Sequence, residues 1–171
     1  EQYTMQFTKQ IFDIGELFNA ATDIAAVRTA YNQVFAAENS YRGGRFTPEL
    51  ALQDAFDTAY RIAQVGLASA PKDGRDELLE AGRKQIESHL VGVKFRREEM
   101  KIAAAKAALI ASALRTARPP DFSALRYDET KLVSLKNVKF DAAHSAVGKL
   151  KAVPEAMWLW AEALLLRGES P

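Results

Sequence analysis

The residues most able to transfer a proton near neutral pH are His89 and His144, because the chain has only these two histidines and no cysteine. His89 follows Arg83 by six positions, in a stretch with helical periodicity. In such a pair the imidazole can act as general acid or base while the guanidinium holds a phosphate. The alternative is structural, with a solvated arginine and a partly buried histidine on one helix.

The seven residues from Arg83 to His89 resemble the signature of HEPN proteins, a family of helical nucleotide-binding proteins and ribonucleases. In that family the pair lies on one helix of a bundle, and dimerisation brings two pairs together to cleave RNA. The resemblance implies that Arg83 clamps a phosphate and that His89 is the acid or base. Lys84 follows the arginine here, where the family commonly has Asn, Asp or His.

The second histidine, His144, is followed four residues later by Gly148. This spacing resembles the phosphorylation motif of histidine-containing phosphotransfer domains, in which an exposed histidine accepts the phosphoryl group and the glycine leaves room for a receiver domain. The lysine that usually precedes the glycine is replaced by Val147, and Lys149 comes after it. The alternative is a histidine beside a small residue in a helix–helix contact.

A basic cluster could also meet phosphates, and it consists of Lys94, Arg96, Arg97 and Lys101. Glu98 and Glu99 stand beside these residues, so pairing along the helix neutralises much of the field. The net charge of the chain is only +1. We therefore interpret the cluster as a solvated helix face and do not expect nucleic acid as a partner. With two histidines and no cysteine, thiolate and multi-histidine metal sites are not expected; counting leaves a carboxylate-rich di-metal site open, but no Glu-x-x-His pair occurs, and we expect no metal or other cofactor.

The element that carries Arg83 and His89 is predicted from apolar residues spaced by seven, namely Leu79, Ile86, Val93, Met100, Ala107 and Leu114. This spacing returns to nearly the same side of an α-helix. It predicts one helix over 76–117, which would be roughly 60 Å long. Gly82 and Gly92 are the points where the helix could bend or fold into a hairpin.

Further helices are predicted on both sides of that segment. Apolar spacing indicates one over 7–18, Asp23 is the expected N-cap of the next, and Thr47 that of a third. For 121–140 we favour helix, although Asp121 and Ser123 suit a loop and Val133, Leu135 and 138–140 could form a short extended piece. Asp141 is expected to cap a helix over 142–151, and a last helix begins at Pro154 and ends at Gly168.

The last helix is apolar on most sides, which predicts burial on several sides or contact with a partner. Trp158 and Trp160 lie about 200° apart around the helix axis, so one of them is a candidate partner contact. The candidate partner-binding residues are Trp158, Leu159, Trp160 and Leu166. The alternative, which we favour for the tryptophans, is a central core helix.

Composition favours a single helical domain over residues 1–171, because 48% of the residues are hydrophobic and no apolar stretch is long enough for a transmembrane helix. The predicted fold is an all-α bundle of five to seven helices around the long central helix. No catalytic signature stands out, so the predicted function is a non-catalytic scaffold, adaptor or subunit that binds a protein partner or a second copy. The start at Glu1 indicates a processed or trimmed terminus, which leaves the compartment open.

Overall fold

The computed structural model describes residues 2–136 and 138–170, with side chains from Met5 onward. The described residues form seven α-helices and no strand, which confirms the all-α prediction. The helices are α1 (Gln2–Ala20), α2 (Ile24–Tyr41), α3 (Pro48–Ala63), α4 (Arg75–His89), α5 (Arg97–Arg115), α6 (Leu132–Leu135) and α7 (Pro154–Leu166). Short 3-10 turns lie at Phe122–Leu125, Glu129–Lys131 and Val147–Lys149.

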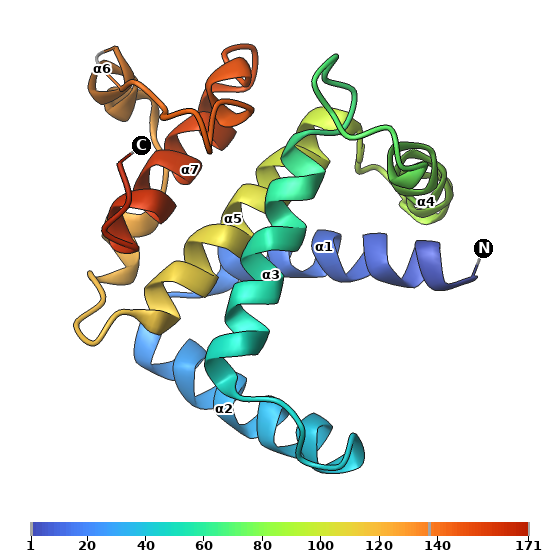
Figure 1. Cartoon of the computed structure of the whole chain (residues 1–171), viewed down its shortest axis with the longest axis vertical. Helices are drawn as coiled ribbons and strands as arrows, with labels where there is room; N and C mark the ends of the chain where they lie inside the picture. Colours follow the sequence, from blue (N-terminus) through green and yellow to red (C-terminus); the bar gives the residue numbers. More distant parts are fainter. Residues whose placement is uncertain (1, 137, 171) are drawn as a thin grey trace.

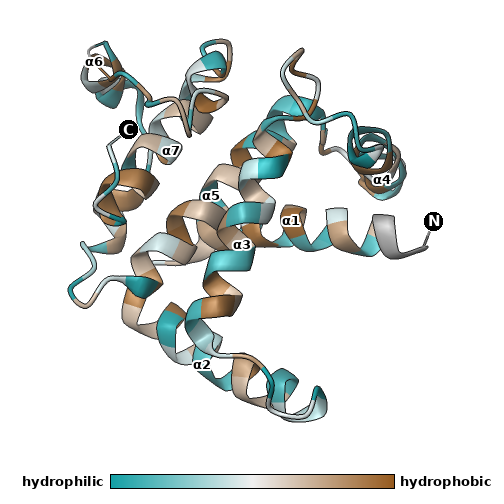
Figure 2. Ribbon diagram, in the orientation of Figure 1, coloured by the Kyte–Doolittle hydropathy of each residue, from teal (hydrophilic) through white to brown (hydrophobic). Residues whose placement is uncertain are grey.

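Helix α5 is the centre of the bundle, and α1, α3 and α7 pack around it (Figure 1). Close approach is possible because α5 is rich in alanine. Gly15 of α1 lies so near α5 that a Cβ on this glycine would be only 2.9 Å from the Cβ of Ala103. Figure 2 shows hydrophobic residues along much of α7, the helix that covers α5 on the side away from α1. The core is therefore built around one alanine-rich helix.

The predicted helix over 76–117 is wrong as a continuous element. Helix α4 ends at His89 and α5 begins at Arg97, because Leu90 is extended and Gly92 adopts a left-handed φ of 75°. Phe95 in this linker is buried, with its ring edge-on to Phe12 at 5.2 Å between centroids. The free energy gained by burying this ring offsets the free energy lost with the helical hydrogen bonds that the break removes.

The two halves do not form a hairpin either, since α4 packs mainly against α1. Most of the residues spaced by seven are nevertheless buried: Leu79, Ile86, Met100, Ala107 and Leu114. Val93 is the exception, and it lies half exposed in the linker. The spacing thus identified buried positions correctly, although the backbone between them is not one helix.

The predicted helix starts are confirmed where a capping side chain is present. The Asp23 carboxylate accepts from the backbone N–H of Ala25 at 2.8 Å, and Thr47 Oγ1 accepts from Leu50 N–H at 3.3 Å. Pro154 occupies the first turn of α7, and Gly168 follows its end with φ 71°. Local capping chemistry thus determined these ends.

The helices predicted over 121–140 and 142–151 are wrong. The first segment contains short turns and the single-turn helix α6, and Asn137 within it lies outside the described residues. The second contains turns and one 3-10 turn, although Asp141 does accept from His144 N–H at 2.9 Å. Both segments instead pack against α7, the first through α6 and the second through the 3-10 turn at Val147–Lys149.

Candidate functional site

Arg83 is a structural residue that holds α4 to the linker before α5. Its side chain is only 9% exposed. Its Nη1 donates to Glu87 and to the backbone carbonyl of Phe95, each at 2.7 Å, and Nη2 donates to Glu80 at 2.8 Å. The hydrogen bond with Glu80 raises the pKa of Arg83, which keeps the guanidinium charged. With its donors taken up by these contacts, the side chain has little left with which to clamp a phosphate.

His89 does not join Arg83 in a site. It is exposed at the last residue of α4, and its Nδ1 lies 2.7 Å from the carbonyl oxygen of Gln85. Six positions along a helix place two side chains about 120° apart around the axis. Arg83 therefore points toward the α4–α5 linker while His89 lies in solvent, and no contact between them is found among the described residues.

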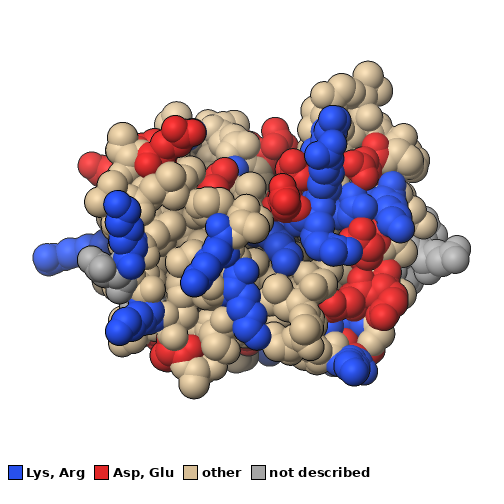
Figure 3. All heavy atoms as spheres, turned by 90° about the horizontal axis from the view of Figure 1, so that it is seen from above, with Lys and Arg blue, Asp and Glu red and all other residues tan. Residues whose placement is uncertain are grey.

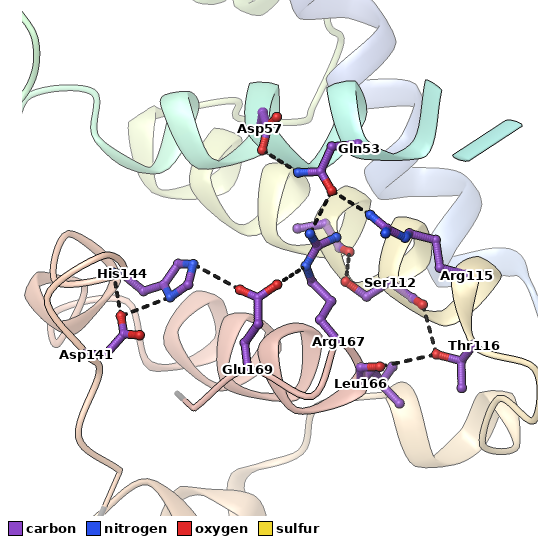
Figure 4. A network of polar contacts seen from close by, with 11 residues as sticks. Gln53, Asp57, Ser112, Arg115, Thr116, Asp141, His144, Leu166, Arg167 and Glu169 are labelled. Atoms are coloured by element: carbon purple, nitrogen blue, oxygen red, sulfur yellow. Dashed lines mark hydrogen bonds and ion pairs between the residues drawn. The ribbon is translucent and has the colours of Figure 1, made fainter. Parts of the chain in front are cut away.

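His144 lies within a polar network that joins the C-terminal tail to the bundle (Figure 4). Its Nδ1 lies 3.0 Å from an Asp141 oxygen, and its Nε2 lies 3.2 Å from a Glu169 oxygen. The ring also meets Tyr60 edge-on, and the side chain is 14% exposed. Gly148 packs against Phe140 instead of facing open space. Both ring nitrogens have partners, so this arrangement leaves no open nitrogen for phosphorylation.

The same network continues from the C-terminal tail into the bundle (Figure 4). Arg167 donates to Glu169 at 2.6 Å and to the side-chain oxygen of Gln53 at 2.7 Å. Arg115 of α5 donates to the same Gln53 oxygen. The Arg167 guanidinium also lies over the Phe56 ring. These contacts hold the tail after α7 against α3 and α5.

The predicted basic patch is divided between buried and exposed positions. Lys101 is 7% exposed, and burial lowers its pKa, with Arg97 contributing in the same direction. Arg97 is exposed but pairs with Glu80 at 3.4 Å. Lys94 and Arg96 remain on the surface. The four residues therefore do not present one basic surface, because α5 turns Lys101 inward.

The tryptophans predicted as partner contacts lie in the core of their own chain. Trp160 has no exposed surface, and its ring meets Phe56 and Tyr60 edge-on at 5.3 and 5.7 Å. Trp158 is 3% exposed and is covered by Tyr127 and Lys131. Leu159 is likewise buried, while Leu166 is partly buried. The segment after α5 covers the outer side of α7, so the apolar helix needs no partner to bury these residues.

An open groove of about 470 Å³ lies between α1, α3 and α4, lined in part by Asp57, Arg61 and Leu78. Arg61 is held by Asp73 at 2.8 Å and Asp76 at 2.7 Å, and these pairs fix the loop before α4 onto α3. The remaining lining consists of Phe7, Ile62 and Leu79 together with Asp54, Thr58 and Arg75, and the groove is open to solvent.

The surface that sequence reasoning missed is the outer face of α2. Of the eighteen residues in this helix, only Ile24 is buried. Val34 is 64% exposed and Tyr41 is 85% exposed. The available signal was the run from Thr29 to Ala37, which contains no charged residue although it lies on a surface helix. Amphipathic surface helices normally place charged or polar residues outward.

Within the described residues, no group of three or more His, Asp or Glu side chains is arranged to hold a metal ion. None of the described helices is long and apolar enough to cross a membrane. Comparison with protein families, with curated proteins and with solved structures finds no match for this chain.

Proposed function

We propose that this protein is a non-catalytic helical assembly subunit, and that the outer face of α2 pairs with the same face of a second copy. The observation that carries the proposal is the exposed surface of α2, which carries no charge from Thr29 to Ala37. The positions of the candidate catalytic residues support the same view. Arg83 and His144 are held in structural contacts, and His89 lies apart from Arg83.

The outer face of α2 is a stripe of small and apolar residues at helical spacing. Its members are Ala26, Ala30, Val34, Ala37 and Tyr41, and all five are exposed. Spacings of three and four residues place them on one side of the helix. The inner side carries Val27 and Tyr31, which are partly buried against the rest of the chain. Val34 follows Val27 by seven residues, so the stripe borders the covered side of α2, and the chain covers Val27 and Tyr31 while leaving the stripe exposed.

The positions along α2 favour a second copy in an antiparallel arrangement. The stripe is nearly symmetric about its centre, so Ala26 of one copy would lie against Tyr41 of the other, and Ala30 against Ala37. A twofold axis makes each of these contacts twice. The uncharged middle of the helix avoids burying an unpaired charge.

The expected interface is small. Eighteen helical residues span about 27 Å, and one helix pair of this length buries less than the area of a typical stable dimer. We therefore expect a reversible dimer with a dissociation constant on the order of 10 µM.

Light scattering from low to high micromolar concentration tests the proposal. The weight-average mass is expected to rise from 18.9 kDa toward twice that value. Val34→Glu is expected to keep the mass at the monomer value with an unchanged circular dichroism spectrum. Val133→Glu is the matched control, because Val133 is 66% exposed on α6, and this variant is expected to dimerise normally. A wild-type chain that stays monomeric throughout would contradict the proposal.

A further inference from the structure

A second feature is independent of α2. We propose that the segment 131–151, with the turn α6 at its start, docks on an anionic lipid bilayer surface. The segment contains five lysines, Lys131, Lys136, Lys139, Lys149 and Lys151. Its one acidic residue is Asp141, whose carboxylate is engaged by the backbone N–H and Nδ1 of His144. The net charge of +1 thus combines a basic segment with an acidic remainder.

Four of the lysines are available for contact. Lys136, Lys139, Lys149 and Lys151 are exposed, and none forms an ion pair with a described carboxylate. Lys149 donates to Ser69 Oγ at 2.8 Å, which places this end of the segment beside the loop after α3. In Figure 3, seen from above, separate basic side chains are spread over the left side, where α6 lies in Figure 1, with acidic side chains at its upper and lower edges; on the right, where α4 lies, basic and acidic side chains are side by side. Unpaired cations of this kind attract an anionic surface.

Exposed apolar side chains accompany these cations. Leu132 and Val133 of α6 are 38% and 66% exposed, and they lie between Lys131 and Lys136 in the sequence. Helix α6 stands at a corner of the molecule, away from α5 (Figure 1). Aliphatic side chains flanked by lysines suit the boundary between lipid headgroups and acyl chains, where the apolar groups enter and the ammonium groups stay among the phosphates.

The residue types favour a bilayer over a nucleic acid. The chain has no arginine between Arg126 and Arg167, so the bidentate contacts that read phosphates and bases are absent from this segment. Its one aromatic residue, Phe140, is partly buried and packs against Gly148, so it offers no surface on which a base could stack. Lysines need no fixed geometry, and this suits a fluid layer of headgroups.

Flotation of the full chain with lipid vesicles tests the proposal. Binding is expected to vesicles of phosphatidylcholine mixed with phosphatidylglycerol, and not to phosphatidylcholine alone. Because each lysine near such a surface strengthens binding about fivefold, the double variant Lys136→Glu and Lys139→Glu is expected to weaken it at least 20-fold. High salt is expected to release the protein. Val133→Asp is expected to weaken binding with the lysines intact.

The control carries the same charge change elsewhere, with Lys84→Glu and Lys94→Glu, two exposed lysines that also form no ion pair. This control is expected to bind within a few-fold of wild type. An equal loss in the control, or no binding to the anionic vesicles, would overturn the proposal. So would binding to a DNA duplex of equal strength with the same dependence on Lys136 and Lys139. Val34→Glu separates this proposal from the pairing of α2, because a monomer should still bind the vesicles.

Discussion

Helices α5 and α2 are nearly equal in length and both rich in alanine, yet they have opposite surroundings. Helix α5 has nineteen residues and buries twelve of them, whereas α2 has eighteen and buries one. Three helices pack around α5, namely α1, α3 and α7. Helix α2 leaves the bundle at an angle (Figure 1). Alanine permits close packing on any side, so its presence does not tell which helix the others will surround.

The attachment of α2 shows how the difference arises. Its first turns touch the end of α5, where Ile24 is buried and the Arg28 guanidinium donates to the carbonyl oxygens of Leu114 at 2.9 Å and Thr116 at 3.0 Å. These carbonyls end a helix and need donors. Beyond Arg28 the helix moves away from α5, and its outer alanines meet solvent.

The largest expected difference in the free energy of unfolding is between two variants that place the same charge in a buried position of α5 and in an exposed position of α2. Ala108 of α5 has no exposed surface, so Ala108→Glu would bury an unpaired carboxylate. We expect it to lower the free energy of unfolding by more than about 4 kcal/mol. Ala30→Glu on α2 should change it by less than about 0.5 kcal/mol. Urea denaturation followed by circular dichroism measures both.

The comparison between the two helices fails if Ala30→Glu is as destabilising as Ala108→Glu, since α2 would then be packed as tightly as α5. Ala30→Glu should still prevent dimerisation in light scattering, because it charges the centre of the proposed interface. A variant that loses the dimer but keeps its free energy of unfolding would show that the outer face of α2 serves dimerisation and not the stability of the fold.

An intermediate effect is expected at the attachment point. Arg28→Met removes the charged donor that caps α5 while keeping an unbranched apolar side chain. The loss should be about 2 kcal/mol, the range for hydrogen bonds to a charged group. Hydrogen exchange should become faster in α2 and stay slow in the middle of α5. Equal acceleration in both helices would mean that α2 is not an independently opening unit.

The smallest expected change in the free energy of unfolding concerns Glu162 on α7, the helix that covers α5. Burial raises the pKa of Glu162 above its ordinary 4.5, and the positive charge of Lys131 opposes this shift. At a pH between the pKa of Glu162 in the unfolded chain and its higher pKa in the folded protein, the folded state binds more protons than the unfolded state. The free energy of unfolding of the wild type therefore falls as the pH rises through this range. Glu162→Gln removes the titration.

The Gln variant should therefore be more stable than wild type at neutral pH, by at most about 0.5 kcal/mol because the group is partly solvated. The difference should disappear as the pH falls below 4.5. Melting temperatures across this pH range measure it. A variant that is less stable than wild type at neutral pH would show that the carboxylate is stabilised in the fold and not penalised by burial.

Local signals predicted the helix starts and many buried positions. Asp23, Thr47 and Pro154 mark helix starts because each satisfies or avoids an unpaired backbone N–H within its own turn. The spacing from Leu79 to Leu114 predicted burial because core positions must face one side. The candidate sites were harder, since the state of Arg83 and His144 depends on residues distant in the sequence, such as Phe95 and Glu169.

The sequence by itself determined that this protein is helical, where α2, α3 and α7 start, and most of the apolar positions that avoid water, because capping and periodicity act within a few turns. Tertiary structure decided the break between α4 and α5, where Phe95 gains more by entering the core than a straight helix would. It also decided which alanine-rich helix is central, and that Trp158 and Trp160 lie inside. These outcomes depend on which surfaces compete for the same neighbours, and such competition exists only once the whole chain has collapsed.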